Sequence, residues 1–156
     1  MQITEMTEKH AIEISKWKYD GDYQIYNLPS WEEMIKGGYA LADAEKRKNE
    51  FHAFVSEDSK LLAFTRHTLQ EDGIMLGAGV NPGYLSAGYG TKAIKLSVEY
   101  LLTHYPTKEI FLEVRTWNMR AVNSYKKAGF AIVKTIERET RIGKGLFYRM
   151  VYLREQ

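Results

Sequence analysis

The alternation of apolar and polar residues changes period along the chain, and each change marks an expected element. From Phe51 onward, apolar residues alternate in the manner of strands, in segments 51–56, 61–68 and 74–80. Turn residues separate these segments, which therefore predict an antiparallel meander. A further short strand is expected near the start of the chain, at 2–6.

Helical periodicity is clearest directly after the meander. Five apolar residues share one helical face there, namely Ile94, Val98, Leu101, Leu102 and Tyr105. A strand at 110–114 follows, and then a short helix that Asn118 can cap and Gly129 can end. Two more strands, separated by a turn at 141–145, complete the pattern.

The first third of the chain shows weaker periodicity. Thr7 can cap a helix that runs to about Trp17, and Ser30 with Glu33 forms a capping-box signature for a second helix. The aromatic-rich segment 17–27 is too irregular for a helix and is expected to be a loop. Segment 39–50 is ambiguous, and its charge run is expected to be solvated surface.

Strands that come first as a meander and then alternate with helices predict an α/β fold with a mixed sheet. A chain of 156 residues without internal repeats or linkers is expected to be one domain, spanning 1–156. Within it, we divide the chain into an N-terminal region, 1–50, and two chemically distinctive stretches, 74–105 and 109–130.

Composition narrows the function classes. The net charge of +2 is too small to indicate a nucleic-acid partner. The absence of cysteine excludes disulfides, thiolate metal sites and a cysteine nucleophile, and it suits a cytoplasmic protein. No signal-peptide pattern and no apolar run of about 18 residues is present, so we expect no membrane association. No metal is expected.

Two glycines interrupt the strand at 74–80. Gly77 and Gly79 lie two residues apart and therefore on one face. Glycine in a strand often marks a place where a ligand or another backbone comes close. Their position indicates either a ligand lying along the strand or a bulky core neighbour, and both interpretations stay open.

Gly88 and Gly90 open the long helix. The first N–H groups of a helix are unpaired and carry partial positive charge, and glycine lets the backbone approach an anion. The segment is therefore suited to a phosphate or a pyrophosphate.

The same residues also fit the dinucleotide fingerprint G-x-G-x-x-A, from Gly88 to Ala93. The context argues against that interpretation. In the fingerprint the first glycine directly follows a strand, whereas residues 82–87 intervene here. A nucleotide-binding oxidoreductase is accordingly set aside.

Two motifs together resemble the GNAT N-acetyltransferase superfamily. The segment NMRAVNSYKKAGF resembles the superfamily's final motif, and it matches at Asn118, Ala121, Tyr125, Gly129 and Phe130. The preceding loop is similar to the superfamily's acetyl-CoA motif, and it matches at Val80, Pro82, Gly88 and Gly90. The motif's usual Arg or Gln falls on Leu85, and its common following Gly falls on Ser86.

The resemblance implies a mixed, mostly antiparallel sheet of about six to seven strands flanked by helices. It also implies acetyl-CoA as a co-substrate, with no metal. The implied cofactor-binding residues are Ala78, Gly79, Val80, Leu85, Ser86, Ala87, Gly88, Tyr89, Gly90, Thr91, Asn118 and Tyr125. Pantetheine would pair with the glycine-bearing strand, and the pyrophosphate would bind backbone amides of the loop.

The resemblance further implies that Tyr125 is the general acid that protonates the leaving thiolate. The ordinary pKa values of a phenol and a thiol are close enough for this transfer. Many relatives carry a carboxylate on the glycine-bearing strand, and this chain has none there. Glu113, on the next strand, is the candidate base by position, and Glu71 and Asp72 are the alternatives.

The acceptor is expected to be a primary amine on a small molecule or a peptide. Tyr19, Tyr23 and Tyr26 are the candidate substrate-binding residues, since aromatic faces attract ammonium groups. A homodimer is possible by analogy with relatives. The alternative is a non-catalytic GNAT-like module that binds CoA or regulates another protein, which Leu85 and the missing strand carboxylate would favour.

Overall fold

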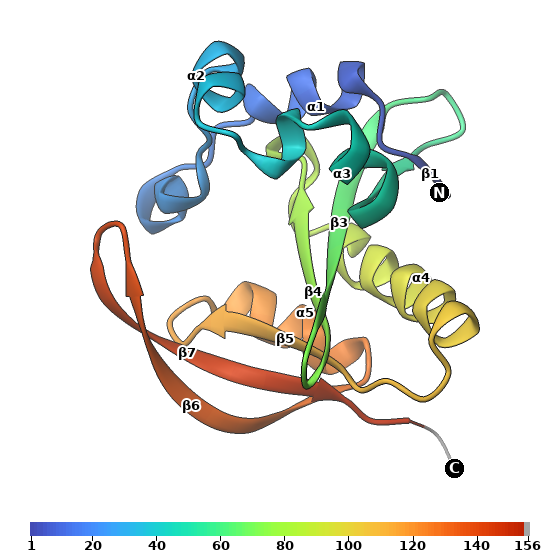
Figure 1. Ribbon diagram of the computed structural model, residues 1–156, viewed down its shortest axis with the longest axis vertical. Helices are drawn as coiled ribbons and strands as arrows, with labels where there is room; N and C mark the ends of the chain where they lie inside the picture. The colour runs from blue at the N-terminus through green and yellow to red at the C-terminus, as the bar shows by residue number, and fades with distance from the viewer. Residues whose placement is uncertain (155–156) are drawn as a thin grey trace. The chain divides into compact units, whose positions relative to one another are not determined.

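The computed structural model describes residues 1–154, and its strands form one seven-stranded sheet in the order β1-β2-β3-β4-β5-β7-β6 (Figure 1). β4 and β5 pair in parallel, whereas β1 with β2, β2 with β3, β5 with β7 and β6 with β7 pair antiparallel. The predicted mixed, mostly antiparallel sheet is confirmed.

The strands lie where the alternation predicted them. Their bounds are β1 Gln2–Glu5, β2 Phe51–Val55, β3 Leu61–Gln70, β4 Gly73–Val80, β5 Ile110–Arg115, β6 Phe130–Thr140 and β7 Gly143–Tyr152. The β6–β7 hairpin differs from the prediction, because β7 begins at Gly143, within the segment 141–145 that was expected as a turn. Thr140 pairs with Gly143, so the turn is tighter than expected.

The helices are α1 Glu8–Ser15, α2 Trp31–Lys36, α3 Ala44–Glu50, α4 Tyr89–His104 and α5 Met119–Lys127. Three 3-10 helices accompany them: η1 Gly21–Tyr26, η2 Ala40–Ala42 and η3 Pro82–Tyr84. The predicted caps are confirmed. The side chains of Thr7, Ser30 and Asn118 accept backbone hydrogen bonds at the starts of α1, α2 and α5.

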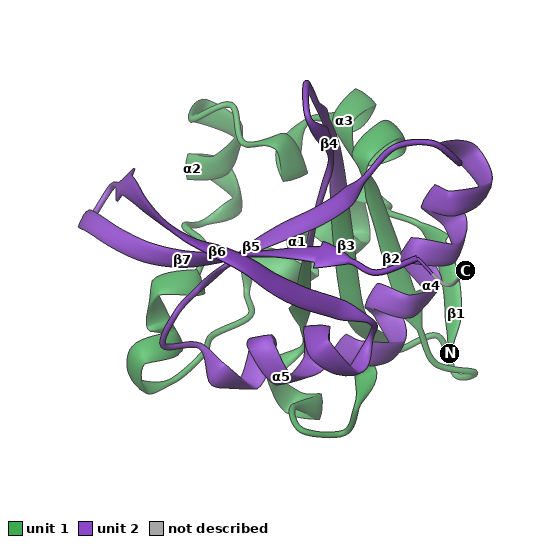
Figure 2. Ribbon diagram, turned by 90° about the horizontal axis from the view of Figure 1, so that it is seen from below, with its two compact units in different colours: residues 1–66, 78–89 green, residues 67–77, 90–156 purple. Residues whose placement is uncertain are grey.

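The chain divides into two compact units, coloured green and purple in Figure 2. Unit 1 comprises residues 1–66 and 78–89, and unit 2 comprises residues 67–77 and the chain from Gly90 onward. Strands β3 and β4 contribute to both units. The single domain predicted over 1–156 stays a prediction.

The core of unit 1 gathers apolar residues from α1, α2, η2, β2 and the start of β3. Its buried members are Met6, Ala11, Ile14, Trp17, Met34, Leu41, Phe51, Ala53, Val55 and Leu61. Tyr19 and Phe64 are half-buried and pack against this cluster. Segment 17–27 therefore begins inside the core.

Two expectations for unit 1 need correction. Segment 17–27 contains η1, where an irregular loop was expected. The ambiguous segment 39–50 contains α3, which is capped because Asp43 Oδ1 accepts hydrogen bonds from the N–H groups of Glu45 and Lys46. The charge run is mostly exposed as predicted, but Arg47 is buried and donates to the Leu41 carbonyl at 3.0 Å.

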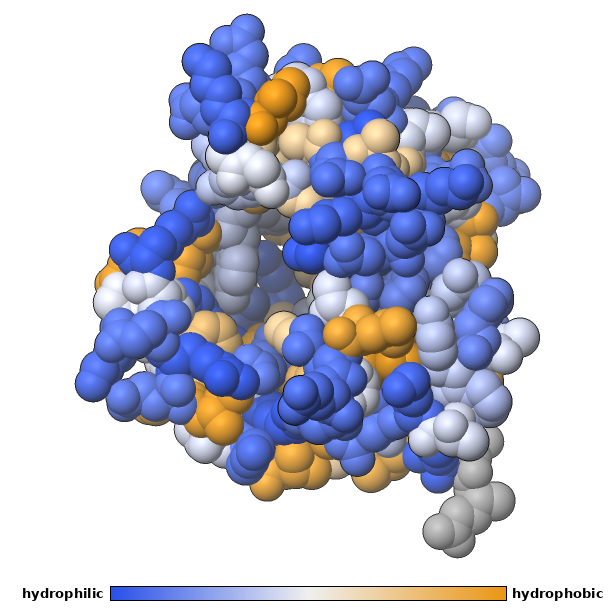
Figure 3. Space-filling model, in the orientation of Figure 1, coloured by the Kyte–Doolittle hydropathy of each residue, from blue (hydrophilic) through white to orange (hydrophobic). Residues whose placement is uncertain are grey.

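Unit 2 has its own buried apolar residues. They come from β4, α4, β5, α5 and β7, and the largest include Ile74, Leu76, Ile94, Leu101, Ile110, Leu112, Val122 and Met150. On the face that Figure 3 shows, hydrophilic residues dominate and hydrophobic residues appear in separate patches. Among the helices of residues 1–154, none combines the length and apolarity that crossing a membrane requires.

Candidate cofactor-binding and active site

The parallel ladder between β4 and β5 is short. In unit 2 it comprises two residue pairs, Ile74 with Ile110 and Met75 with Phe111, although β5 continues to Arg115. Ile74 N–H donates to the Glu109 carbonyl at 2.8 Å where the ladder begins. Beyond these pairs, the described ladder no longer joins the two strands.

The direction of the backbone groups at the end of β4 follows from its pairing in unit 1. Asn81 N–H donates to the Leu62 carbonyl on β3 at 2.9 Å. Because the N–H and C=O groups of successive residues in a strand point to opposite edges, those of Val80 and Ala78 point away from β3. An extended ligand with amide groups could pair with that edge in the manner of a strand.

The two glycines of β4 have different surroundings. A Cβ placed on Gly79 would overlap the ring of Phe64 in unit 1, whereas a Cβ on Gly77 would meet no atom within 4 Å. The interpretation as a bulky core neighbour therefore holds for Gly79. Gly77 lies beside open space, which leaves room next to the strand for a ligand.

The loop after β4 is largely exposed to solvent. Ser86, Ala87 and Gly88 are exposed, whereas Leu85 is half-buried. Ser86 and Gly88 have φ values of 62° and 83°, both in the left-handed region. Ser86 stands where the resembled motif usually has glycine, and it adopts the left-handed backbone conformation that glycine favours.

A hydrogen bond in unit 2 joins helix α4 to helix α5. The Thr91 hydroxyl, in the first turn of α4, donates to the carbonyl of Ser124 on α5 at 3.4 Å. Tyr125 is the next residue of α5 and is half-buried. The structure therefore brings the first turn of the predicted phosphate-binding helix next to the segment that carries the predicted general acid.

Asn118 is buried, and its side chain has a clear structural role. Its Oδ1 accepts a hydrogen bond from Ala121 N–H at 3.2 Å and so caps α5. The cap orients the helix that carries Tyr125. The predicted contact of Asn118 with the cofactor stays a prediction.

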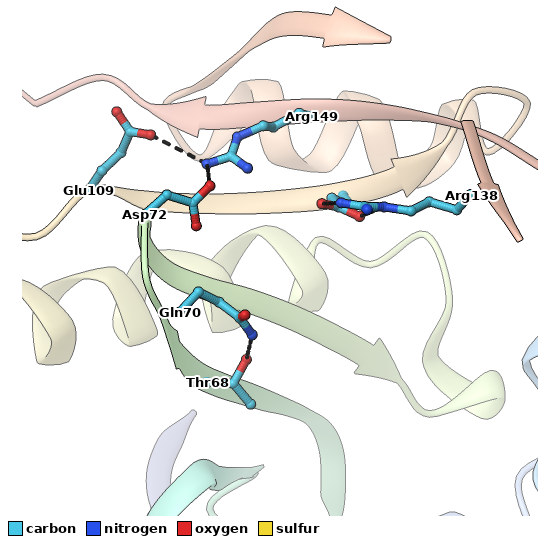
Figure 4. Close-up of polar contacts among 7 residues, drawn as sticks. Thr68, Gln70, Asp72, Glu109, Arg138 and Arg149 are labelled. Carbon is cyan, nitrogen blue, oxygen red and sulfur yellow. Dashed lines mark hydrogen bonds and ion pairs between the residues drawn. The ribbon is translucent and has the colours of Figure 1, made fainter. Parts of the chain in front are cut away.

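Glu113 has a firm partner within unit 2. Its two carboxylate oxygens accept hydrogen bonds from Arg138 at 3.1 and 2.8 Å, and its side chain is 11% exposed (Figure 4). The hydrogen bonds to Glu113 raise the pKa of Arg138 above its ordinary value. Because 25 residues separate the partners, local sequence pattern does not predict this ion pair.

Arg149 of β7 forms a second charged group in unit 2. It lies 3.0 Å from Asp72 and 3.6 Å from Glu109 (Figure 4). Its guanidinium also stacks 3.7 Å from the centre of the Phe111 ring. In sequence, Asp72 and Glu109 come just before the paired residues of β4 and β5. Arg149 therefore stabilises the point at which β4 and β5 pair.

The three candidate substrate-binding tyrosines lie in unit 1, on or next to η1. Tyr23 is half-buried and Tyr26 is 40% exposed. Tyr19 differs from both, because its hydroxyl donates to the Val80 carbonyl at 2.7 Å. Among residues 1–154, no group of three or more His, Asp or Glu side chains is placed to hold a metal ion.

Comparisons with known proteins agree with this geometry. A family model described as the acetyltransferase (GNAT) family matches residues 11–130. An N-alpha-acetyltransferase of Sulfurisphaera tokodaii is 36% identical over 69 residues, which cover 44% of this chain and 41% of that protein. The chain thus aligns with less than half the length of this curated relative.

Solved structures show the same fold. A GNAT-family acetyltransferase from Bacillus anthracis superposes with a TM-score of 0.78 at 14% identity, covering 97% of this chain and 93% of that one. AAC(6')-Ib in complex with paromomycin and acetyl-CoA gives a TM-score of 0.70 at 18% identity, with coverage of 97% and 92%. Because the family model matches well over half of its residues, the chain belongs to the GNAT acetyltransferase family.

Proposed function

We propose that this protein is an acetyl-CoA-dependent N-acetyltransferase. It would move the acetyl group to a primary amine by direct attack within a ternary complex. The observation that carries the proposal is the hydrogen bond from Thr91 to the Ser124 carbonyl. It joins the first turn of α4, a suitable anion site, to the residue that precedes Tyr125, a suitable proton donor.

In this proposal the cofactor binds mainly to backbone groups. Pantetheine pairs with β4 at Ala78, Gly79 and Val80, and the pyrophosphate binds amides from Leu85 to Thr91. Three observations support this assignment: the short β4–β5 ladder, the exposed residues 86–88 of the loop and the left-handed backbone at Ser86 and Gly88. Since the donors are amides, Leu85 still contributes an N–H even though it lacks the polar side chain of the resembled motif.

The chemistry requires two proton transfers. The amine nitrogen attacks the acetyl carbonyl carbon, and collapse of the tetrahedral intermediate breaks the C–S bond. Tyr125 gives its hydroxyl proton to the departing thiolate, and Glu113 accepts the proton that the amine loses. Because Arg138 donates to both oxygens of Glu113, the amine proton would be accepted at a lone pair that Arg138 does not occupy.

The acceptor is proposed to be a primary amine recognised by the N-terminal region, including Tyr23 and Tyr26. The curated relative is named for N-alpha-acetylation, and a structural neighbour binds paromomycin; both names concern amines. A panel that contains a peptide with a free N-terminus, a polyamine and an aminoglycoside would identify the class. A cytoplasmic location is part of the proposal, since the sequence contains no cysteine.

Substituting Tyr125→Phe tests the catalytic role. We expect kcat to fall by about 10²–10⁴-fold, which is the usual contribution of a general acid, while the Kd for acetyl-CoA changes less than about twofold. A steady-state acetyltransferase assay measures kcat, and calorimetry measures the Kd for acetyl-CoA. Tyr39→Phe, a half-buried tyrosine of the unit 1 core, is the matched control. Unchanged turnover in Tyr125→Phe would show that another group protonates the thiolate.

A second candidate function is a non-catalytic module that binds CoA. The ion pair between Glu113 and Arg138 favours it, because this pair occupies the carboxylate proposed as the base. The amine panel decides between the two. Tight binding of acetyl-CoA without acetyl transfer to any amine, in a protein that retains Tyr125, would support the module.

A further inference from the structure

Tyr19 connects two segments of unit 1 that are distant in sequence. Its hydroxyl donates to the carbonyl of Val80, the last residue of β4, at 2.7 Å, although 61 residues separate the two. The rest of its side chain packs against the core of unit 1. The ring therefore has a fixed position from which the hydroxyl reaches the strand.

The same residue anchors the loop that follows it. Asn27 Oδ1 accepts a hydrogen bond from Tyr19 N–H at 2.7 Å, and Asn27 Nδ2 donates to the Tyr19 carbonyl at 3.4 Å. These bonds hold the two ends of the segment 19–27 together, with η1 between them. A contact that restrains Tyr19 therefore also restrains residues 19–27, which we call the tyrosine loop.

A second contact joins the start of this region to β4. The ring of Trp17 packs on the ring of Phe64, with centroids 5.9 Å apart, and the Phe64 ring lies against Gly79. Trp17 therefore contacts the face of β4 through Phe64, while Tyr19 contacts its edge at Val80. Trp17 and Tyr19 thus restrain two consecutive residues of β4, Gly79 through Phe64 and Val80 directly.

We propose that Tyr19 is a positioning residue that couples the tyrosine loop to the cofactor strand. The inference rests on the proposed function, in which acetyl-CoA pairs with the edge of β4 that carries the Val80 carbonyl. Because Tyr19 already uses that carbonyl, the cofactor would pair with both backbone groups of Ala78 and with the N–H of Val80. Coupling between two sites is reciprocal, so acetyl-CoA on β4 also restrains the loop that carries Tyr23 and Tyr26.

Hydrogen exchange in the ligand-free protein tests the coupling without depending on activity. In Tyr19→Phe, which keeps the ring, we expect amide exchange to accelerate about fivefold both in 19–27 and in 78–84, as loss of one hydrogen bond would produce. In Asn27→Ala, exchange should accelerate more in 19–27 than in 78–84, since the bond from Tyr19 to Val80 remains. Tyr39→Phe, whose ring packs on the same core, should exchange at the wild-type rate in both segments.

Calorimetry with acetyl-CoA then tests whether the coupling reaches the cofactor. We expect the Kd of Tyr19→Phe for acetyl-CoA to rise about three- to tenfold. Wild-type exchange in either segment of Tyr19→Phe, or a wild-type Kd despite faster exchange, would overturn the inference. If the wild-type protein does not bind acetyl-CoA while the two segments still exchange together, the proposed function fails and the coupling between the segments stands.

Discussion

The two glycines of β4 show how much a single position depends on its neighbours. They share one strand face, yet only Gly79 has an aromatic ring where a Cβ would lie. From sequence alone, a ligand and a core neighbour both remain open as explanations for the pair. Deciding between them needs the position of Phe64, which depends on the register of two strands.

Alanine should therefore destabilise the protein more at Gly79 than at Gly77. Gly79→Ala forces the Phe64 ring to move, and we expect a loss of about 1–3 kcal/mol in the free energy of unfolding, typical of overpacking. Gly77→Ala enters open space and should change stability by less than about 1 kcal/mol. Urea unfolding of both variants measures the difference, and equal losses would contradict the contrast between the two sites.

Glu113 and Arg138 form an ion pair in unit 2. Glu113 was selected from sequence as the one carboxylate on β5 near the motif, and the structure shows that Arg138 binds both of its oxygens. Arg138 itself is 54% exposed at its side chain, so the pair adds little to stability. The role of Glu113 as base stays a prediction that substitution can test.

Paired substitutions separate the two roles of Glu113. If it accepts the amine proton, Glu113→Gln should lower kcat by about 10²-fold or more, whereas Arg138→Gln should keep or raise kcat because the carboxylate becomes free. Steady-state kinetics with saturating acetyl-CoA measures both. Equal losses in the two variants would mean that the ion pair matters only for the structure.

At the scale of elements, sequence reasoning succeeded where an apolar stripe or a capping residue was present. The stripe that begins at Ile94 predicted α4, and Thr7, Ser30 and Asn118 predicted the starts of α1, α2 and α5. Helix α3 has no such stripe, since Arg47 is its one buried residue. The Asp43 cap and the bond from Arg47 to Leu41 hold it, and neither is visible as periodicity.

The Asp43 cap gives α3 a dependence on pH. The hydrogen bond from Lys46 N–H, followed by that from Glu45, lowers the pKa of Asp43 below its ordinary value of 3.8. A lowered pKa in the folded state means that the carboxylate stabilises the protein above about pH 4 and loses this effect as pH falls through the lowered value.

Asp43→Asn removes the titration while keeping an acceptor for the cap. Urea midpoints of the wild type and the variant, followed from pH 5 to below pH 4, should therefore differ in slope, with the wild type losing more of its stability. Parallel curves over that range would show that the Asp43 charge does not stabilise α3.

For the whole molecule, two motifs predicted from sequence the family, the mixed sheet and the order of its elements. The pairing of charges in unit 2 and the bond from Tyr19 to Val80 were not predictable, because each joins residues that are far apart in the chain. Such contacts depend on strand register and loop conformation rather than on local pattern. The division into two compact units, with β3 and β4 shared, had no signal in composition.

The proposed function requires that this GNAT-family chain bind acetyl-CoA, and calorimetric titration of the purified protein with acetyl-CoA measures that binding. NADH, titrated in parallel, controls for general binding of nucleotides. We expect binding of acetyl-CoA in the micromolar range and none of NADH. In the proposal, backbone groups of β4 pair with pantetheine, and backbone amides of the loop 86–91 bind the pyrophosphate. A folded protein that binds no acetyl-CoA would contradict the account.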